Sequence, residues 1–248
     1  MLTSQQVSGW LEKQKPFLLY PGVRPPYVSS IFCSDCQAQW FTLRCCRSVW
    51  CPICNWKLAV RMSDYLKQLR SMLSSNYKAL MITLTFKNIE RMSMYTFTDY
   101  RHTFRKKFLR SGKIKKLILG GFYSFDWTVS KTCYDQPFNI HIHLLAFSKA
   151  YIPFHILKTQ WHKATGDSEV VWISDVQNLD KAMHEVCNYI EQTEKLSNCR
   201  PDKREELMKS IQGMRRFSKF GIAYKIKLPR KKGRCAKCKG HSFQLHNF

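Results

Sequence analysis

The chain has 248 residues, of which 44% are hydrophobic and 14% aromatic, so it can build a full folded core. Lys and Arg number 41 against 17 Asp and Glu, and the net charge of +24 indicates a polyanionic partner, nucleic acid ahead of an anionic membrane. No apolar run approaches the roughly 18–20 residues that span a bilayer, and no secretory signal opens the chain, so we expect a cytoplasmic protein.

A cysteine-rich module follows an irregular N-terminal stretch, and it occupies residues 31–55. Eleven cysteines in a chain expected to be cytoplasmic indicate metal binding ahead of disulfides. Four of them form two C-x2-C pairs at a spacing close to that of a zinc ribbon: Cys33, Cys36, Cys51 and Cys54. Cys45 and Cys46 lie between the pairs, so the four ligands of a structural Zn²⁺ stay open.

Helical and strand patterns follow the cysteine module. Apolar residues at helical spacing predict an amphipathic helix over 56–74, and a β-rich run predicts a strand over 79–86. Residues 93–110 predict a helix with an aromatic stripe on one side and basic residues on the rest. The basic residues include three candidate DNA contacts: Arg105, Lys106 and Lys107.

The middle of the chain predicts two neighbouring antiparallel strands, over 117–130 and 138–147. A helix over 153–164, a strand over 169–176 and a helix over 178–196 come next. Because strands and helices intermingle around an antiparallel sheet, the predicted class is α+β.

The C-terminal segment is strongly basic, with the run KIKLPRKKGRCAKCK at 225–239. Even a solvated tail of this kind binds phosphate backbones non-specifically. It contains a third C-x2-C pair, Cys235 and Cys238, with His241 and His246 nearby. This pair predicts a second small zinc site or one half of a shared site.

The strand FNIHIHLLAF carries two histidines, His141 and His143, on one face, because side chains alternate along a strand. Each histidine alone has a structural interpretation, but the pair also suits a metal. Asp126, on the preceding strand, has the parity to place a carboxylate beside them. Two histidines and one carboxylate leave coordination positions open, as a catalytic metal requires.

The helix over 178–196 places Glu185 and Tyr189 four residues apart, on one helical face. A tyrosine hydroxyl near a metal-bound phosphate can attack the phosphorus in line. A basic protein with these groups is suited to cleaving DNA.

These segments resemble the rolling-circle replication initiators of the HUH endonuclease superfamily, in particular the single-tyrosine Rep proteins of small plasmids. The family's first motif strand is similar to MITLT at 81–85, and its histidine motif is similar to HIHLL at 141–145. Its acidic-x-Thr motif resembles DWT at 126–128, with Asp where the family usually has Glu. The resemblance extends over residues 33–225.

The family's Glu-x-x-x-Tyr motif is matched by Glu185 and Tyr189. Family members often carry Lys just before the tyrosine and three residues after it. Here Asn188 and Gln192 stand at those positions, and Lys195 is the nearest downstream cation.

Two further segments support the resemblance. CRSVWCPICNW, which starts at Cys46, resembles the cysteine-rich entry to the family's first helix and makes Cys46 a rival zinc ligand. Arg215-Arg216-Phe217 with Gly221 resembles the closing segment, and it adds Arg215 and Arg216 to the candidate DNA contacts.

The resemblance implies a nicking and joining reaction at an origin. His141, His143 and Asp126 would hold Mg²⁺ or Mn²⁺. Tyr189 would attack the scissile phosphate and leave a 5′-phosphotyrosyl bond and a free 3′-OH, and Glu185 would activate water at termination. The implied partners are single-stranded DNA, as a hairpin or nick site, and a host helicase and polymerase, since no G-x-x-x-x-G-K-[ST] motif is present.

The implied fold is a central antiparallel sheet of about five strands with helices on one face, similar to an RRM-like or ferredoxin-like layout, with the histidines on a central strand. The predicted regions are an N-terminal segment with the zinc module over 1–56, an HUH endonuclease domain over 57–225 and a basic Cys/His tail over 226–248.

Two other interpretations stay open. A zinc-containing DNA-binding protein without catalysis explains the charge and the cysteines, but it leaves the His-x-His strand and the Glu-x-x-x-Tyr helix as coincidences. A transposase or relaxase of the same superfamily keeps the chemistry. Relaxases usually carry three histidines in this motif, so His-x-His favours replication or transposition.

Overall fold

The computed structural model describes residues 27–44, 77–93, 95–130, 137–188, 199–211, 217–226 and 243–247, together with residues 58, 60, 61, 64, 65, 68, 69, 135, 214, 237 and 238. The chain divides into two compact units: Met1–Cys54 with Pro229–Phe248, and Asn55–Leu228. None of the helices in the described ranges combines the length and the apolarity needed to cross a bilayer.

The first unit contains a three-stranded antiparallel sheet in the order β2-β1-β8. Its strands are β1 (Tyr27–Cys33), β2 (Gln39–Arg44) and β8 (Phe243–Asn247). Because β8 pairs with β1, the C-terminal segment that the sequence sets apart as a tail lies in the same unit as the N-terminal cysteines.

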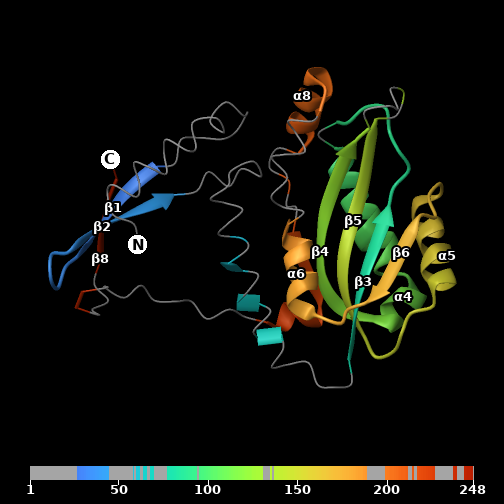
Figure 1. Cartoon of the computed structure of the whole chain (residues 1–248), viewed down its shortest axis with the longest axis horizontal. Helices are drawn as coiled ribbons and strands as arrows, with labels where there is room; N and C mark the ends of the chain where they lie inside the picture. Colours follow the sequence, from blue (N-terminus) through green and yellow to red (C-terminus); the bar gives the residue numbers. More distant parts are fainter. Residues whose placement is uncertain are drawn as a thin grey trace. The chain divides into compact units, whose positions relative to one another are not determined.

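The second unit is built on a five-stranded sheet in the order β6-β3-β5-β4-β7, and every neighbouring pair is antiparallel. The strands are β3 (Lys78–Thr85), β4 (Ile118–Val129), β5 (Phe138–Ser148), β6 (Val171–Asp175) and β7 (Phe217–Gly221). The predicted α+β fold is therefore confirmed. The histidine strand β5 is the central strand, between β3 and β4 (Figure 1).

Aromatic packing joins one face of this sheet, here called the helical face, to a layer of helices. The layer consists of α3 (Thr96–His102), the π-helix η2 (Thr103–Phe108), α4 (Gly112–Leu117) and α5 (Phe154–Thr165). Phe104 of η2 meets the Tyr123 ring at 4.7 Å, and Phe108 meets Trp161 at 5.4 Å. The Trp161 indole N–H donates to the Thr85 carbonyl at 2.9 Å, so this large side chain is buried without losing its hydrogen bond.

The opposite face is also covered in part, so the expectation of helices on one face only is wrong. Met183 and Val186 of α6 (Leu179–Asn188) are buried in one cluster with Met81, Phe122 and Leu145. The side chains of these strand residues point to the same face of the sheet as the two histidines, opposite the helical face. Each face of the sheet carries apolar side chains that must be shielded from water. The helix α6 covers those on the face opposite the helical face. A further helix, α8 (Pro201–Ser210), and the 3₁₀ turn η3 (Ile222–Lys225) also belong to this unit.

The pairing of β4 with β5 depends on a glycine at the start of β4. A Cβ at Gly121 would collide with the carbonyl oxygen of Leu145, whereas a Cβ at the exposed Gly112 meets nothing within 4 Å. We expect Gly121→Ala to destabilise the second unit by about 1–3 kcal/mol, the usual range for overpacking. Thermal unfolding of the purified variants measures this. Gly112→Ala is the matched control and should leave the midpoint unchanged or slightly raised. Equal midpoints for the two variants would contradict the tight pairing.

Candidate functional site

A polar cluster occupies the sheet face opposite the helical face, here called the histidine face. Its side chains come from three adjacent strands: Thr83, Thr85, Ser124, Asp126, His141 and His143. His143 stands opposite Thr83 on one side and Ser124 on the other, which puts all three on the same face. The sheet register therefore assembles the cluster from residues far apart in sequence.

Each histidine ring is oriented by a threonine of β3. The Nδ1 atom of His143 lies 3.2 Å from the Thr83 hydroxyl oxygen, and that of His141 lies 3.1 Å from the Thr85 hydroxyl oxygen. A hydrogen bond at Nδ1 directs Nε2 away from β3. This is the arrangement by which neighbouring oxygens orient metal-binding histidines.

Asp126 lies beside His143, as the strand parity predicts. Its Oδ2 atom is 3.4 Å from His143 Nε2, while its Oδ1 atom accepts from the Trp127 backbone N–H at 2.6 Å. Both side chains are buried, with residue exposures of 3% and 7%. The carboxylate is therefore held in place on a sheet face at low exposure.

The pair suits a hard divalent cation. Oxygen or nitrogen ligands at about 2.0–2.2 Å in octahedral geometry lie about 3 Å apart, close to the separation of Nε2 and Oδ2. The buried Ser124 hydroxyl, which stands opposite His143, has no hydrogen-bond partner among the described residues and adds an oxygen at the same place.

His141 is placed less closely. Its ring centroid is 6.2 Å from that of His143. In the described part of the chain, only a cysteine group brings three candidate ligand atoms within 4.8 Å of one another. His141 would therefore have to rotate toward the pair of His143 and Asp126 to become a third ligand.

The predicted nucleophile motif lies on α6. Glu185 is exposed on this helix, whose buried side packs on the histidine face through Met183 and Val186. Tyr189 follows the last residue of α6, Asn188, and lies outside the described residues. Three predicted DNA contacts also lie outside them: Lys195, Arg215 and Arg216.

Two described tyrosines are poorly suited to act as the nucleophile. Burial, and then the charge of Asp167, raises the pKa of Tyr100 to about 12. Burial also raises the pKa of Tyr123 above its ordinary value. Tyr100 stacks on Phe86 at 3.9 Å and Tyr123 packs on Phe104, so neither belongs to the histidine face.

The other predicted DNA contacts lie on the far side of the sheet. Arg105, Lys106 and Lys107 are exposed residues of η2, which packs on the helical face. The structure therefore does not bring them together with His143 and Asp126.

A second site is formed by cysteines of the first unit. The ligand atoms of Cys33, Cys36 and Cys238 all lie within 4.8 Å of one another, and the Cys33 and Cys238 sulfurs are 3.5 Å apart. Zn–S bonds of about 2.3 Å in a tetrahedron place sulfurs about 3.8 Å apart, so the group fits a metal. Cys238 belongs to the third C-x2-C pair, which favours the shared site over a separate one.

The remaining predicted zinc ligands lie outside the described residues: Cys46, Cys51, Cys54 and Cys235. A structural zinc takes four ligands, so the fourth would come from among them or from another undescribed residue. Cys235 is our candidate for the fourth ligand, because it forms a C-x2-C pair with Cys238, which already belongs to the group.

Thr83 and Thr85 are site residues that sequence reasoning did not assign. Their shared face with Met81 can be inferred from alternation along the strand, but their pairing with the histidines depends on the register of β3 against β5. A Thr-x-Thr spacing matching the His-x-His spacing is the signal that relates them.

Comparisons with known proteins agree on one family. The family model described as Replication protein (Rep_1) matches residues 37–238. A curated relative, the Protein rep of Lactiplantibacillus plantarum, is 30% identical over 119 residues, which cover 45% of this chain and 34% of the relative. The match thus spans about a third of that relative's length. No solved structure matches the chain.

The cysteine group predicts a bound metal that depends on both ends of the chain. We expect the purified protein to hold one Zn²⁺ per chain at this site, and Cys33→Ser or Cys238→Ser to lose most of it, because each removes a thiolate ligand. Elemental analysis by mass spectrometry gives the stoichiometry. Cys199→Ser is the control, since Cys199 lies in the other unit and is not part of the group. Full metal content in Cys238→Ser would exclude the shared site.

Proposed function

Because the chain belongs to the Replication protein (Rep_1) family, we propose that it nicks and rejoins one DNA strand at an origin to start and end rolling-circle replication. The observation that carries the proposal is the buried pairing of His143 with Asp126 on a polar sheet face of a protein with a net charge of +24. The charge attracts the DNA backbone, and the pair offers a place for a divalent cation at that backbone.

His143, Asp126 and, after rotation, His141 would hold Mg²⁺ or Mn²⁺. The bound ion supplies Lewis-acid polarisation of the scissile phosphate. The threonine hydroxyls accept from the Nδ1–H of each ring in this assignment, so the Nε2 lone pairs face the metal position. Thr83 and Thr85 thus act as positioning residues.

Tyr189 is the proposed nucleophile. Its hydroxyl oxygen forms a bond to phosphorus, the bond from phosphorus to the 3′ oxygen breaks, and the 3′ oxygen takes up a proton. A free tyrosine has a pKa of about 10, so its proton must pass to a base during the attack. The products are a 5′-phosphotyrosyl bond and a free 3′-OH. Because the phosphodiester energy is conserved in the covalent bond, rejoining requires no ATP.

Glu185 is proposed to act at termination. It lies on α6 four residues before Tyr189 and is exposed, so water can reach it. A carboxylate in that position can take a proton from water as a general base and so direct hydrolysis of the phosphotyrosyl bond. Removing the carboxylate would leave cleavage intact and let the covalent complex accumulate.

The proposed partners are single-stranded DNA at an origin, in a hairpin or nick site, and a host helicase and polymerase. The free 3′-OH is the primer that a polymerase extends. The cysteine group is proposed to hold a structural Zn²⁺ that ties β1 to the C-terminal segment.

Tyr189→Phe should reduce formation of the covalent protein–DNA adduct by about 10³-fold or more, because it removes the attacking oxygen. The assay mixes the protein with circular single-stranded DNA and Mn²⁺, digests with nuclease and maps the nucleotide adduct by mass spectrometry. Tyr65→Phe is the matched control: Tyr65 also packs on the histidine face, against Phe122 at 6.2 Å, and its loss of a hydroxyl should leave the adduct yield unchanged. An adduct in Tyr189→Phe would refute the assigned nucleophile.

Thr83→Val should raise the Mn²⁺ concentration for half-maximal cleavage by about 10- to 100-fold, the usual cost of losing a group that orients a metal ligand. The maximal rate at saturating Mn²⁺ should change far less, because the metal ligands themselves remain. Thr83→Ser keeps the hydroxyl and should restore the unaltered Mn²⁺ dependence. If serine and valine behave alike, Thr83 has only a packing role.

A further inference from the structure

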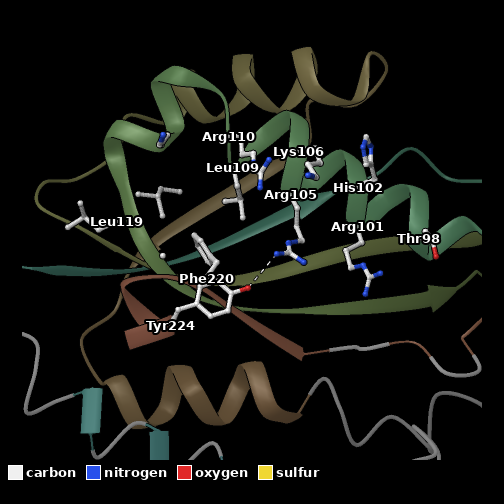
Figure 2. A pocket seen from close by; sticks show the side chains of 13 residues that line it. Thr98, Arg101, His102, Arg105, Lys106, Leu109, Arg110, Leu119, Phe220 and Tyr224 are labelled. Atoms are coloured by element: carbon white, nitrogen blue, oxygen red, sulfur yellow. Dashed lines mark hydrogen bonds between the residues drawn. The ribbon is translucent and has the colours of Figure 1, made fainter. Parts of the chain in front are cut away.

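A hollow of about 670 Å³ lies on the helical side of the second unit, between the helix α3–η2 and the β7–η3 turn (Figure 2). We call it the basic groove. Of the thirteen described residues that line it, none is acidic and six are basic: Arg101, His102, Arg105, Lys106, Arg110 and Lys115. In the described part of the chain, none of these six forms an ion pair with a carboxylate. The groove therefore concentrates positive potential that the described residues do not neutralise.

The π-helix arranges these cations along one wall. The Leu109 backbone N–H donates to the Phe104 carbonyl at 2.9 Å, a bond that spans five residues. With the wider turn, Arg105 and Arg110, five residues apart, both line the groove, while Phe104 and Phe108 remain buried on the other side. Single π turns are frequent at functional sites.

Aromatic side chains form the facing wall. Tyr224 is 52% exposed, and its hydroxyl accepts from the Arg105 guanidinium at 3.4 Å, as Figure 2 shows. The chain turns toward it at Gly221, whose φ of 55° is left-handed and whose Cβ, if present, would collide with the Leu119 carbonyl oxygen. Phe220, just before this turn, lies 6.2 Å from the Tyr123 ring.

The basic groove and the histidine face lie on opposite sides of the sheet. Phe220 contacts Tyr123, which packs under Phe104 on the helical face. His143 stands opposite Ser124, the residue next to Tyr123, and adjacent residues of a strand point to opposite faces. A ligand in the groove therefore does not compete with a phosphate at His143 and Asp126.

We propose that the basic groove binds a segment of unpaired single-stranded DNA, with its phosphates on the arginines and a base stacked on Tyr224. An exposed aromatic ring beside a row of cations is how proteins bind unpaired strands, since each unpaired base offers a free face. Paired bases are stacked on each other and offer no such face to Tyr224. This inference rests on the proposed function, because that function identifies the polyanion that binds in the basic groove as DNA.

Charge reversal tests the cationic wall. In Arg105→Glu/Arg110→Glu, binding of a labelled oligothymidylate, followed by fluorescence anisotropy at several salt concentrations, should weaken by tenfold or more. The slope of log affinity against log salt should shrink by about 1.4, because two phosphate contacts on a single strand are lost. Lys113→Glu/Lys116→Glu is the matched control: it makes the same charge change at exposed α4 positions outside the groove. Equal losses in both double variants would overturn the site.

The aromatic wall has its own test. Tyr224→Ala should weaken binding of the single strand by about 5- to 150-fold, the range for one stacked base, and leave the salt slope unchanged. Tyr224→Phe keeps the ring and should bind as the unaltered protein does. Unchanged affinity of Tyr224→Ala, or an equal loss with a duplex of the same length, would overturn binding of an unpaired strand in the groove.

These binding results are separable from the proposed function. The groove variants should still form the Tyr189 adduct at saturating DNA, since the nucleophile and the histidine face are unaltered. If the unaltered protein forms no adduct but the groove variants lose strand binding, the cleavage proposal fails and the groove proposal stands.

Discussion

The register of β5 between β3 and β4 is the constraint on which the rest of the structure depends. Because side chains alternate with a period of two, a slip of one residue would exchange the two faces of the strand. Ile142 and Leu144 are fully buried on the helical face, and His143 lies between them in sequence on the other. A slip would place imidazoles among the aromatic rings of the helical layer and expose the aliphatic residues. Core packing on the helical face therefore fixes which residues meet on the histidine face.

The histidine face has an apolar part that packs against a helix and a polar part that holds the proposed metal ligands. Its apolar part, around Phe122 and Leu145, is covered by Met183 and Val186 of α6, and its polar part holds His143 and Asp126. Burying the apolar part fixes where the described residues of α6 lie on the sheet. The same packing that stabilises the sheet thus brings the helix that carries Glu185 onto the histidine face.

Much of this arrangement could be predicted from sequence, where the signal is local. Alternation in FNIHIHLLAF correctly predicts a strand with both histidines on one face, and the parity of Asp126 correctly predicts its approach. What sequence reasoning missed is non-local or irregular. The pairing of strand β8 with β1 has no local pattern that predicts it. The approach of Cys238 to Cys33, across 205 residues, is one of two alternatives that the third C-x2-C pair leaves open. The π-helix η2 departs from the 3.6-residue period on which helical predictions rest.

The two sides of the sheet suit two different demands of a nicking reaction. After cleavage the proposed covalent bond to Tyr189 would hold the 5′ end of the cut strand, but no covalent bond would hold its 3′ end. A row of cations holds a strand by counterion release, which is strong at low salt yet lets the strand slide, as extension of the 3′ end requires. Under both proposals, separation by one sheet layer would allow tight, metal-dependent positioning on one side and loose, electrostatic retention on the other, and the single register of β4 on β5 supports both sides.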